Sequence, residues 1–289
     1  MKSSESVFLD IRGLKVHCRC WGAAGQPKLF LLHGWMDFSA SFQFLVDALR
    51  HAWHVIAPDW RGYGLSDRSG SDTYWFPDYF ADLEQILAHF QPAEPVQLVG
   101  HSMGGNVAAL YAGIRPERVA RLVNMEGFGL NDARPEDAPQ RYARWLDQLE
   151  KGARLRDYGS FDELADRLRS NNARLTPERS LFLARHWGMA TAEGRVALRA
   201  DPAHKLVNPV LYRLEEAKAC WRRIAAPVLW IEGENSQNAN DLRMSAADRD
   251  SRKAAFSDLV ERIIPDSGHM MHHDQPERAA ALIEDFLLR

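Results

Sequence analysis

The fold of this 289-residue chain is decided by the stretch Val96-Gln97-Leu98-Val99-Gly100-His101-Ser102-Met103-Gly104-Gly105. An apolar run typical of a buried strand leads directly into a Gly-x-Ser-x-Gly turn, and residues 106–114 (NVAALYAGI) have the pattern of a helix packed on that strand. A strand that turns so sharply into a helix would crowd the side chains on both sides of the apex, and Gly100 and Gly104 remove them. We therefore predict a strained turn that holds Ser102 free at the carboxyl edge of a sheet, where it would act as a nucleophile.

Strands and helices alternate on both sides of this turn. Strand patterns occupy residues 7–11, 14–21, 28–32, 53–57, 119–125, 227–231 and 259–264, and helical patterns occupy residues 42–49, 79–90 and 276–288. Arg12-Gly13 is a hairpin signal between the first two strands. This order is typical of an α/β protein whose mostly parallel sheet is covered by helices on both faces, here after an antiparallel start.

Residues 130–222 differ in character from the rest of the chain. They are rich in arginine, aspartate and glutamate, carry amphipathic helical patterns, and contain no convincing strand pattern. An insertion between two strands of one sheet, at their carboxyl ends, lies where it can cover a site at that edge. We therefore predict a core of residues 1–129 and 223–289 with a helical cap of residues 130–222. A separate helical domain with its own binding role is the alternative.

Composition excludes several classes of partner. A net charge of −3 offers no electrostatic footprint for nucleic acid or for an anionic membrane surface. Residues 1–6 lack the apolar core of a signal peptide, and no stretch is long enough to span a bilayer. Three cysteines are too few for a disulfide framework, and Cys18 and Cys20 share one strand face as small buried thiols of a reducing compartment. We expect a cytoplasmic protein that acts on a small molecule.

A serine nucleophile needs a base, and His269 is the candidate. It lies in the loop after the last predicted strand, a flexible position from which an imidazole can swing over Ser102. His101 is expected to be packed inside the protein. His272 and His273 begin a more helical stretch and are expected to be solvated or to support His269.

Two glutamates compete for the acid that orients this base. The usual place is the loop after residues 227–231, but Ser236 stands where a carboxylate is expected, and Glu234 lies one or two residues early. Glu126 closes a strand of otherwise apolar residues, which is a costly place for a charge unless a partner such as a histidine compensates it. We favour Glu126 over Glu234. A cap or salt-bridge role for Glu126 at the start of the insertion is the remaining alternative.

Four motifs fall in order along the chain: Leu32-His33-Gly34-Trp35, residues 58–67 (PDWRGYGLSD), residues 100–105 (GHSMGG) and Gly268-His269. Together they resemble the α/β-hydrolase superfamily, and the His-Gly-Trp turn and the Gly-His-x-x-His ending resemble its serine-hydrolase-like branch. The resemblance implies the α/β-hydrolase fold, with a mostly parallel eight-stranded sheet, helices on both faces and an inserted cap. A glutamate after the sixth core strand also resembles the haloalkane dehalogenases. Those enzymes attack with an aspartate, which Ser102 excludes.

The resemblance also implies the other parts of the site. The backbone N–H groups of Trp35 and Met103 would hold the oxyanion of a tetrahedral intermediate. Residues 59–67 would be scaffold, with Arg61 paired to a carboxylate. An apolar substrate pocket is expected, and the candidates for its lining are Trp35, Phe128, Trp145 and Trp187.

These parts imply a serine hydrolase that cleaves a carboxylic ester or related acyl bond through an acyl-enzyme, without a metal or cofactor. Ser102 would attack, His269 would transfer the proton, and Glu126 would stabilise the imidazolium. Two other functions on this fold stay open: cofactor-free dioxygenation of aromatic heterocycles, and small-molecule binding with little or no hydrolysis.

Overall fold

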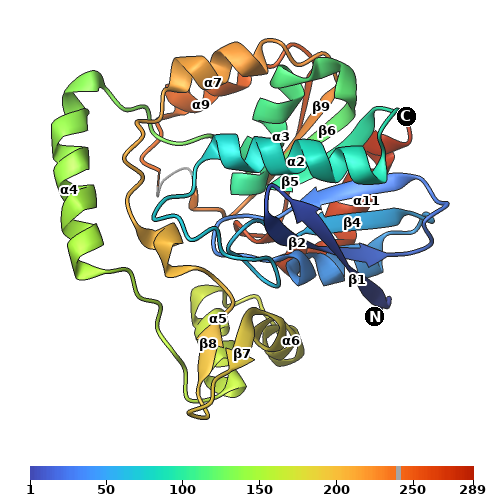
Figure 1. Ribbon diagram of the computed structural model, residues 1–289. Helices are drawn as coiled ribbons and strands as arrows, with labels where there is room; N and C mark the ends of the chain where they lie inside the picture. Colours follow the sequence, from blue (N-terminus) through green and yellow to red (C-terminus); the bar gives the residue numbers. More distant parts are fainter. Residues whose placement is uncertain (239–241) are drawn as a thin grey trace.

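An eight-stranded sheet forms the centre of the computed structural model, which describes residues 1–238 and 242–289 (Figure 1). In spatial order its strands are β1 (Ser4–Ile11), β2 (Leu14–Trp21), β4 (His54–Pro58), β3 (Lys28–Leu32), β5 (Val96–His101), β6 (Val119–Met125), β9 (Val228–Gly233) and β10 (Leu259–Ile264). The pairs β1–β2 and β2–β4 are antiparallel, and all pairs from β4 to β10 are parallel. The predicted mostly parallel sheet with an antiparallel start is confirmed.

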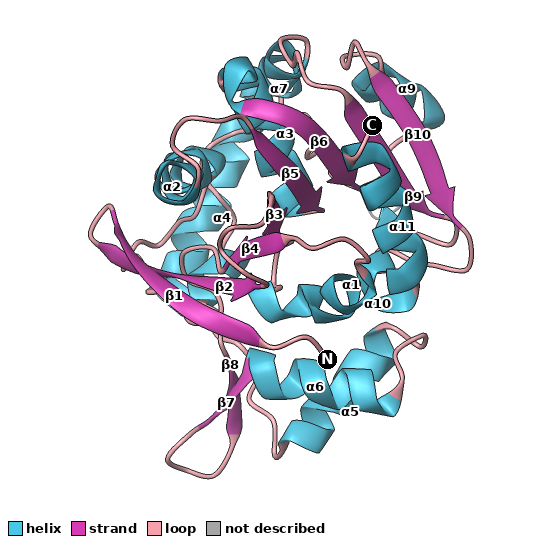
Figure 2. Ribbon diagram, turned by 90° about the vertical axis from the view of Figure 1, so that its right-hand side faces the viewer, coloured by secondary structure: helices cyan, strands magenta, loops and turns pink. Residues whose placement is uncertain are grey.

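Helices cover both faces of this sheet (Figure 2). One face carries α2 (Phe76–Phe90), α3 (Met103–Ile114) and α7 (Leu214–Trp221), and the other carries α1 (Gln43–Ala48) and α11 (Pro276–Leu287). Shorter helices α9 (Ala246–Lys253) and α10 (Met271–Asp274) flank β10 in the sequence. Successive strand side chains point to opposite faces, so Leu98 packs in the first apolar layer and Val99 in the second. Strands buried on both faces explain the continuous apolar runs of the sequence.

The hairpin predicted at Arg12-Gly13 is confirmed. Ile11 pairs with Leu14, which leaves two residues in the turn. Their φ angles are 51° at Arg12 and 80° at Gly13. Two positive φ angles match the type I′ turn, whose twist fits the right-handed twist of the flanking strands.

The inserted residues form two parts that differ in their packing (Figure 1). Helix α4 (Ala138–Lys151) stands apart from the sheet and buries none of its residues. Helices α5 (Phe161–Asn171) and α6 (Pro177–Trp187) pack with the hairpin of β7 (Gly188–Ala190) and β8 (Val196–Leu198) around their own small apolar cluster. The expectation that this region contains no strand is wrong for β7 and β8. Three residues per strand are too few to show a two-residue alternation in sequence.

Helix α7 also falls within the predicted cap range, and the structure packs it against α3 of the core. A Cβ added to Gly113 of α3 would collide with the backbone of Cys220 in α7. Such close approach makes α7 part of the layer that covers the sheet. In the described part of the chain, no helix has the length and apolar character that crossing a membrane requires.

Candidate active site

Ser102 occupies the predicted sharp turn between β5 and α3. Its φ and ψ angles are 53° and −118°, a sparsely populated region for a residue with a side chain. A Cβ on Gly100 would collide with the carbonyl of Gly104, and a Cβ on Gly104 would collide with the carbonyl of Leu32 in β3. Glycine is therefore required at both positions, and Ser102 is held at the carboxyl edge of the sheet as predicted.

The structure brings Glu126 and His269 together, although 143 residues separate them in sequence. Nδ1 of His269 lies 2.6 Å from Oε2 of Glu126, a carboxylate that is 1% exposed at the end of β6. Glu234 is exposed, and its carboxylate accepts a hydrogen bond from the N–H of Asp266. Of the two glutamates considered from the sequence, Glu126 is the one that contacts the histidine.

Two further donors fix the Glu126 carboxylate. The N–H of Gly233 donates to Oε1 at 2.8 Å, and the hydroxyl of Ser236 donates to Oε2 at 2.7 Å. Ser236 holds the position where a carboxylate was expected after β9. Because β6 and β9 are neighbours in the sheet, a carboxylate from the end of β6 reaches the same place. A small hydroxyl residue at that position leaves room for the Glu126 carboxylate and donates a hydrogen bond to it.

Backbone contacts join the three segments that carry Ser102, Glu126 and His269. The N–H of Ser102 donates to the carbonyl of Met125, the residue before Glu126, at 2.8 Å. Nε2 of His101 lies 2.8 Å from the carbonyl oxygen of His269, and because a carbonyl only accepts, the imidazole is the donor. These two hydrogen bonds connect the turn that carries Ser102 to the end of β6, where Glu126 lies, and to the loop that carries His269.

The two predicted oxyanion donors flank Ser102. A Cβ on Gly34 would lie only 3.2 Å from Cβ of Ser102, so the backbone that leads into Trp35 passes directly beside the serine. Met103 is the first residue of α3, and the first N–H groups of a helix have no acceptor within the helix. Both N–H groups belong to main chain that close packing holds in place.

His33 fixes the turn that precedes Trp35. The N–H of Trp60 donates to Nε2 of His33 at 3.0 Å, so the proton is on Nδ1, which donates to the carbonyl of Gly34 at 2.8 Å. Burial lowers the pKa of His33 to about 4, which keeps this ring neutral at pH 7. Arg61 in the following scaffold segment pairs with Asp82 through two contacts of 2.6 Å, as predicted.

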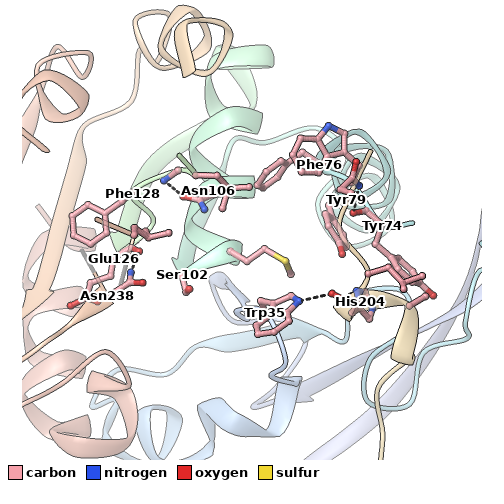
Figure 3. Close-up of a pocket in the computed structure, with 18 residues that line it drawn as sticks. Trp35, Tyr74, Phe76, Tyr79, Ser102, Asn106, Glu126, Phe128, His204 and Asn238 are labelled. Atoms are coloured by element: carbon pink, nitrogen blue, oxygen red, sulfur yellow. Dashed lines mark hydrogen bonds between the residues drawn. The ribbon is translucent and has the colours of Figure 1, made fainter. Parts of the chain in front are cut away.

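A cavity of about 350 Å³ opens at Ser102 and Glu126 (Figure 3). Its aromatic wall consists of Trp35, Tyr74, Trp75, Phe76, Tyr79 and Phe128. Uncharged polar groups of Asn106, Asn208 and Asn238 also line it, together with His204. Among the described lining residues, Glu126 is the only acidic or basic side chain apart from that histidine. A largely apolar space beside a hydroxyl and a carboxylate is typical of small-molecule sites.

Two of the four predicted lining residues lie elsewhere. Trp35 and Phe128 line the cavity, but Trp145 and Trp187 do not. Trp187 ends α6 and stacks on Phe38 with ring centroids 6.3 Å apart, while Trp145 lies on α4, which buries no residue. Neither of these two tryptophans of the insertion therefore reaches the cavity. The aromatic residues at 74–76, which form a Tyr-Trp-Phe run in the sequence, supply that part of the wall.

His204 attaches the insertion to the core at the rim of the cavity. Its ring stacks between those of Tyr63 and Tyr74, with centroid distances of 3.7 and 3.8 Å. Burial lowers the pKa of His204 to about 3, so the ring is neutral at pH 7. The indole N–H of Trp35 donates to the backbone carbonyl of His204 at 3.1 Å (Figure 3).

The other histidines near His269 are inside the protein. His101 is buried as predicted, and its pKa is held well below the usual value by burial and by the neighbouring His269. His272 and His273 are 0% and 4% exposed, so the expectation that they are solvated is wrong. Helix α10 turns both rings inward against α1 and its preceding turn, where Ser41 contacts them. Their part in supporting His269 remains a prediction.

Comparison with known proteins places this geometry in a family. The family model described as alpha/beta hydrolase fold matches residues 27–276. The chain is 25% identical over 301 residues to a serine hydrolase-like protein of Danio rerio, covering 99% of this chain and 90% of that protein. It is 24% identical over 284 residues to serine hydrolase-like protein 2 of Homo sapiens, covering 94% and 90% of the two chains.

Solved structures share the same fold. A thioesterase domain from the curacin biosynthetic pathway superposes with a TM-score of 0.86 at 22% identity, over 97% of this chain and 99% of that domain. E-2-(acetamidomethylene)succinate hydrolase superposes with a TM-score of 0.77 at 22% identity, over 99% of this chain and all of that chain (100%). At these identities the likeness concerns the fold alone.

Proposed function

We propose, from the premise that the chain belongs to the α/β-hydrolase fold family and its serine-hydrolase-like branch, that this hydrolase is a serine esterase. It would cleave a carboxylic ester, or a related acyl bond, of a small and largely apolar substrate through an acyl-enzyme. The observation that carries the proposal is the 2.6 Å contact between His269 and the buried Glu126, beside a serine in a strained turn. A nucleophile, a base and an orienting acid in this arrangement are the parts that acyl transfer requires.

The proposed reaction has two halves, and in each of them His269 acts first as a base and then as an acid. Because Nδ1 of His269 faces Glu126, Nε2 is the nitrogen that accepts the proton of Ser102 as its oxygen attacks the carbonyl carbon. The N–H groups of Trp35 and Met103 stabilise the oxyanion, each contributing about 10²–10³ in rate. The imidazolium then protonates the leaving alcohol. In the second half the same histidine deprotonates a water molecule, whose oxygen attacks the acyl carbonyl. The imidazolium then returns that proton to the oxygen of Ser102 as the carboxylic acid product leaves.

The cavity wall supports a neutral substrate. Glu126 is the only carboxylate among the described lining residues, and neither an arginine nor a lysine is among them. An anionic substrate would therefore lose its hydration without gaining a cationic partner, which is costly. The aromatic wall instead favours apolar acyl or alcohol groups.

The proposal is tested with p-nitrophenyl esters of increasing acyl length and with a fluorophosphonate probe. We expect a pre-steady-state burst of p-nitrophenol, and covalent labelling of Ser102 that mass spectrometry locates. Ser102→Ala should lose both. p-Nitrophenyl butyrate should be cleaved at least tenfold more efficiently than p-nitrophenyl hemisuccinate, which has a similar length and one negative charge. Labelling at another residue, or unchanged turnover in Ser102→Ala, would refute the assignment.

The same measurements separate the other functions of this fold. Oxygen uptake with an aromatic heterocycle, without a burst on any ester, would identify a dioxygenase instead. Tight binding of a small molecule with negligible turnover would identify a binding protein. Both outcomes contradict the esterase proposal.

A further inference from the structure

Three buried side chains gather beside the proposed catalytic groups without belonging to them: Asp37, His101 and His272. One potential ligand atom from each lies within 4.8 Å of the others. The three residues are 6%, 1% and 0% exposed. They come from the turn after β3, the last residue of β5 and the short helix α10, so the cluster joins segments far apart in sequence.

The hydrogen bonds of His101 leave one ring nitrogen free. Its Nε2 donates to the carbonyl of His269, so a neutral ring carries its lone pair on Nδ1. Among the described residues, this buried Nδ1 has no hydrogen-bond partner. A histidine that donates one nitrogen to a backbone carbonyl and keeps the other free has the arrangement usual for metal-binding imidazoles.

His272 and Asp37 complete the set in a similar way. Nδ1 of His272 is also buried without a partner in the described structure, and its Nε2 lies 3.9 Å from Oδ2 of Asp37. The hydroxyl of Ser41 donates to Oδ2 of Asp37 at 3.0 Å, which orients the carboxylate. His273 lies 2.7 Å from the same hydroxyl and 3.2 Å from the Ser41 carbonyl, so it donates to Ser41 and takes no part in the set.

We propose that Asp37, His101 and His272 bind a divalent transition-metal ion of the zinc type, which clamps the turn after β3, the end of β5 and α10 together. Two imidazoles and one carboxylate are a common ligand set for such ions, and a water molecule would complete a tetrahedron. Ligand distances of about 2.0–2.2 Å place tetrahedral ligand atoms roughly 3.3–3.6 Å apart. The present separations, which are at most 4.8 Å, would have to shorten to that range when the ion binds. An ion bound by Nδ1 of His101 would supply the partner that this buried nitrogen otherwise lacks in the described structure.

Zinc binding to the chelator-treated protein tests the site directly. We expect close to one Zn²⁺ per chain after equilibrium dialysis against ZnCl₂, with a higher melting temperature than the metal-free protein has. Asp37→Asn keeps the shape of the side chain and should weaken binding at least tenfold. Ser41→Ala should weaken it about 10–100-fold, because outer-shell partners orient the ligands. His89→Gln, which changes an exposed histidine, is the matched control and should bind as the unmodified chain does.

Anomalous diffraction at the zinc edge decides the position without any variant. A peak bonded to His101, His272 and Asp37 is the expected result, and it stands even if a variant folds poorly. A peak at the His269–Glu126 pair or at surface histidines, or a water molecule in place of the ion at saturating ZnCl₂, would overturn the proposal. So would full binding by Asp37→Asn. Because these readouts measure binding, their failure would leave the esterase proposal standing.

Discussion

The carboxyl edge of the sheet and the insertion of residues 130–222 are held in different ways. At the sheet edge, backbone segments pass so close that Gly100 and Gly104 have no room for a side chain, and Gly34 has little. In the insertion, α4 buries no residue, and contact with the cavity rim consists of a short backbone bridge between Tyr63 and Ala200 and of side chains such as His204. The difference shows that the positions of the reacting groups depend on close main-chain packing, which few sequences allow. The cavity wall depends on side chains, which can change without disturbing the chemistry.

The largest expected effect lies at the sheet edge. Glu126→Gln keeps the shape of the side chain but removes the charge that stabilises the His269 imidazolium. We expect kcat for a p-nitrophenyl ester to fall by about 10³–10⁴-fold. Steady-state kinetics with active-site titration measures the loss. Glu234→Gln is the matched control and should stay within about twofold, because that carboxylate is exposed and contacts Asp266. The reverse result would move the acid to the β9 loop.

Transferring the carboxylate from the end of β6 to position 236, after β9, tests whether His269 requires a carboxylate at that place in space and not Glu126 itself. Ser236 lies within hydrogen-bond distance of the Glu126 carboxylate, so an aspartate there would reach the same space. Glu126→Ala with Ser236→Asp should recover at least tenfold in kcat over Glu126→Ala alone. Ser236→Asp in the otherwise unchanged chain should not gain activity, because two carboxylates would then compete for one site. No recovery would mean that only the end of β6 can orient His269.

The two regions also differ in how well the sequence predicts them. The elbow at Ser102 and the hairpin at Arg12-Gly13 follow from local rules, because glycine spacing and turn length fix them within a few residues. The choice between Glu126 and Glu234 depended on a contact across 143 residues, and only the cost of a buried charge favoured Glu126, the glutamate that contacts His269.

The cavity wall was less predictable for a physical reason. An aromatic residue in an amphipathic segment has the same sequence pattern whether its ring packs against other side chains or faces a cavity. Trp187 stacks on Phe38, whereas Tyr74 and Phe76 line the cavity. Hydrophobic periodicity carries no information that separates these outcomes.

Buried histidines should make the protein less stable in acid. Besides His101, His272 and His273, whose pKa values are also lowered by burial, they include one histidine from each of the two regions. His33 and His204 are neutral when folded, with pKa values lowered by burial to about 4 and about 3. In the unfolded chain the two imidazoles have pKa values near 6.5. Their contribution to the free energy of unfolding is therefore fully present above about pH 6.5 and is lost as the pH falls towards their pKa values in the folded protein. Each histidine should lower the free energy of unfolding by about 1.4 kcal/mol per pH unit in this window.

Urea unfolding between pH 7 and pH 5 measures that slope. His204→Gln removes one titrating group and should flatten the slope by its share, while His89→Gln should leave it unchanged. A slope that His204→Gln does not alter would show that the insertion detaches, or that His204 is protonated, before the core unfolds.

Substitutions of two tryptophans test which part of the molecule contacts the substrate. Trp35 lines the cavity, and Trp145 lies on α4 of the insertion. Trp35→Ala removes a lining ring but keeps the backbone N–H proposed as an oxyanion donor. We expect KM to rise about five- to tenfold, with kcat nearly unchanged, because apolar contact with the substrate is lost. Trp145→Ala should change KM by less than twofold, since Trp145 does not line the cavity. Equal effects from both variants would mean that α4 closes over the substrate during turnover.

The smallest expected effect concerns one of the hydrogen bonds that join the two regions. Trp35→Phe keeps an aromatic ring in the wall but removes the indole N–H that donates to the carbonyl of His204. A hydrogen bond of this kind contributes about 0.5–1.5 kcal/mol, so KM should rise two- to threefold and the melting temperature should fall by about 2 °C. A loss as large as that of Trp35→Ala would show that the ring itself matters little. The position of the His204 segment, which this hydrogen bond fixes, would then matter more for substrate binding than the apolar surface of the Trp35 ring.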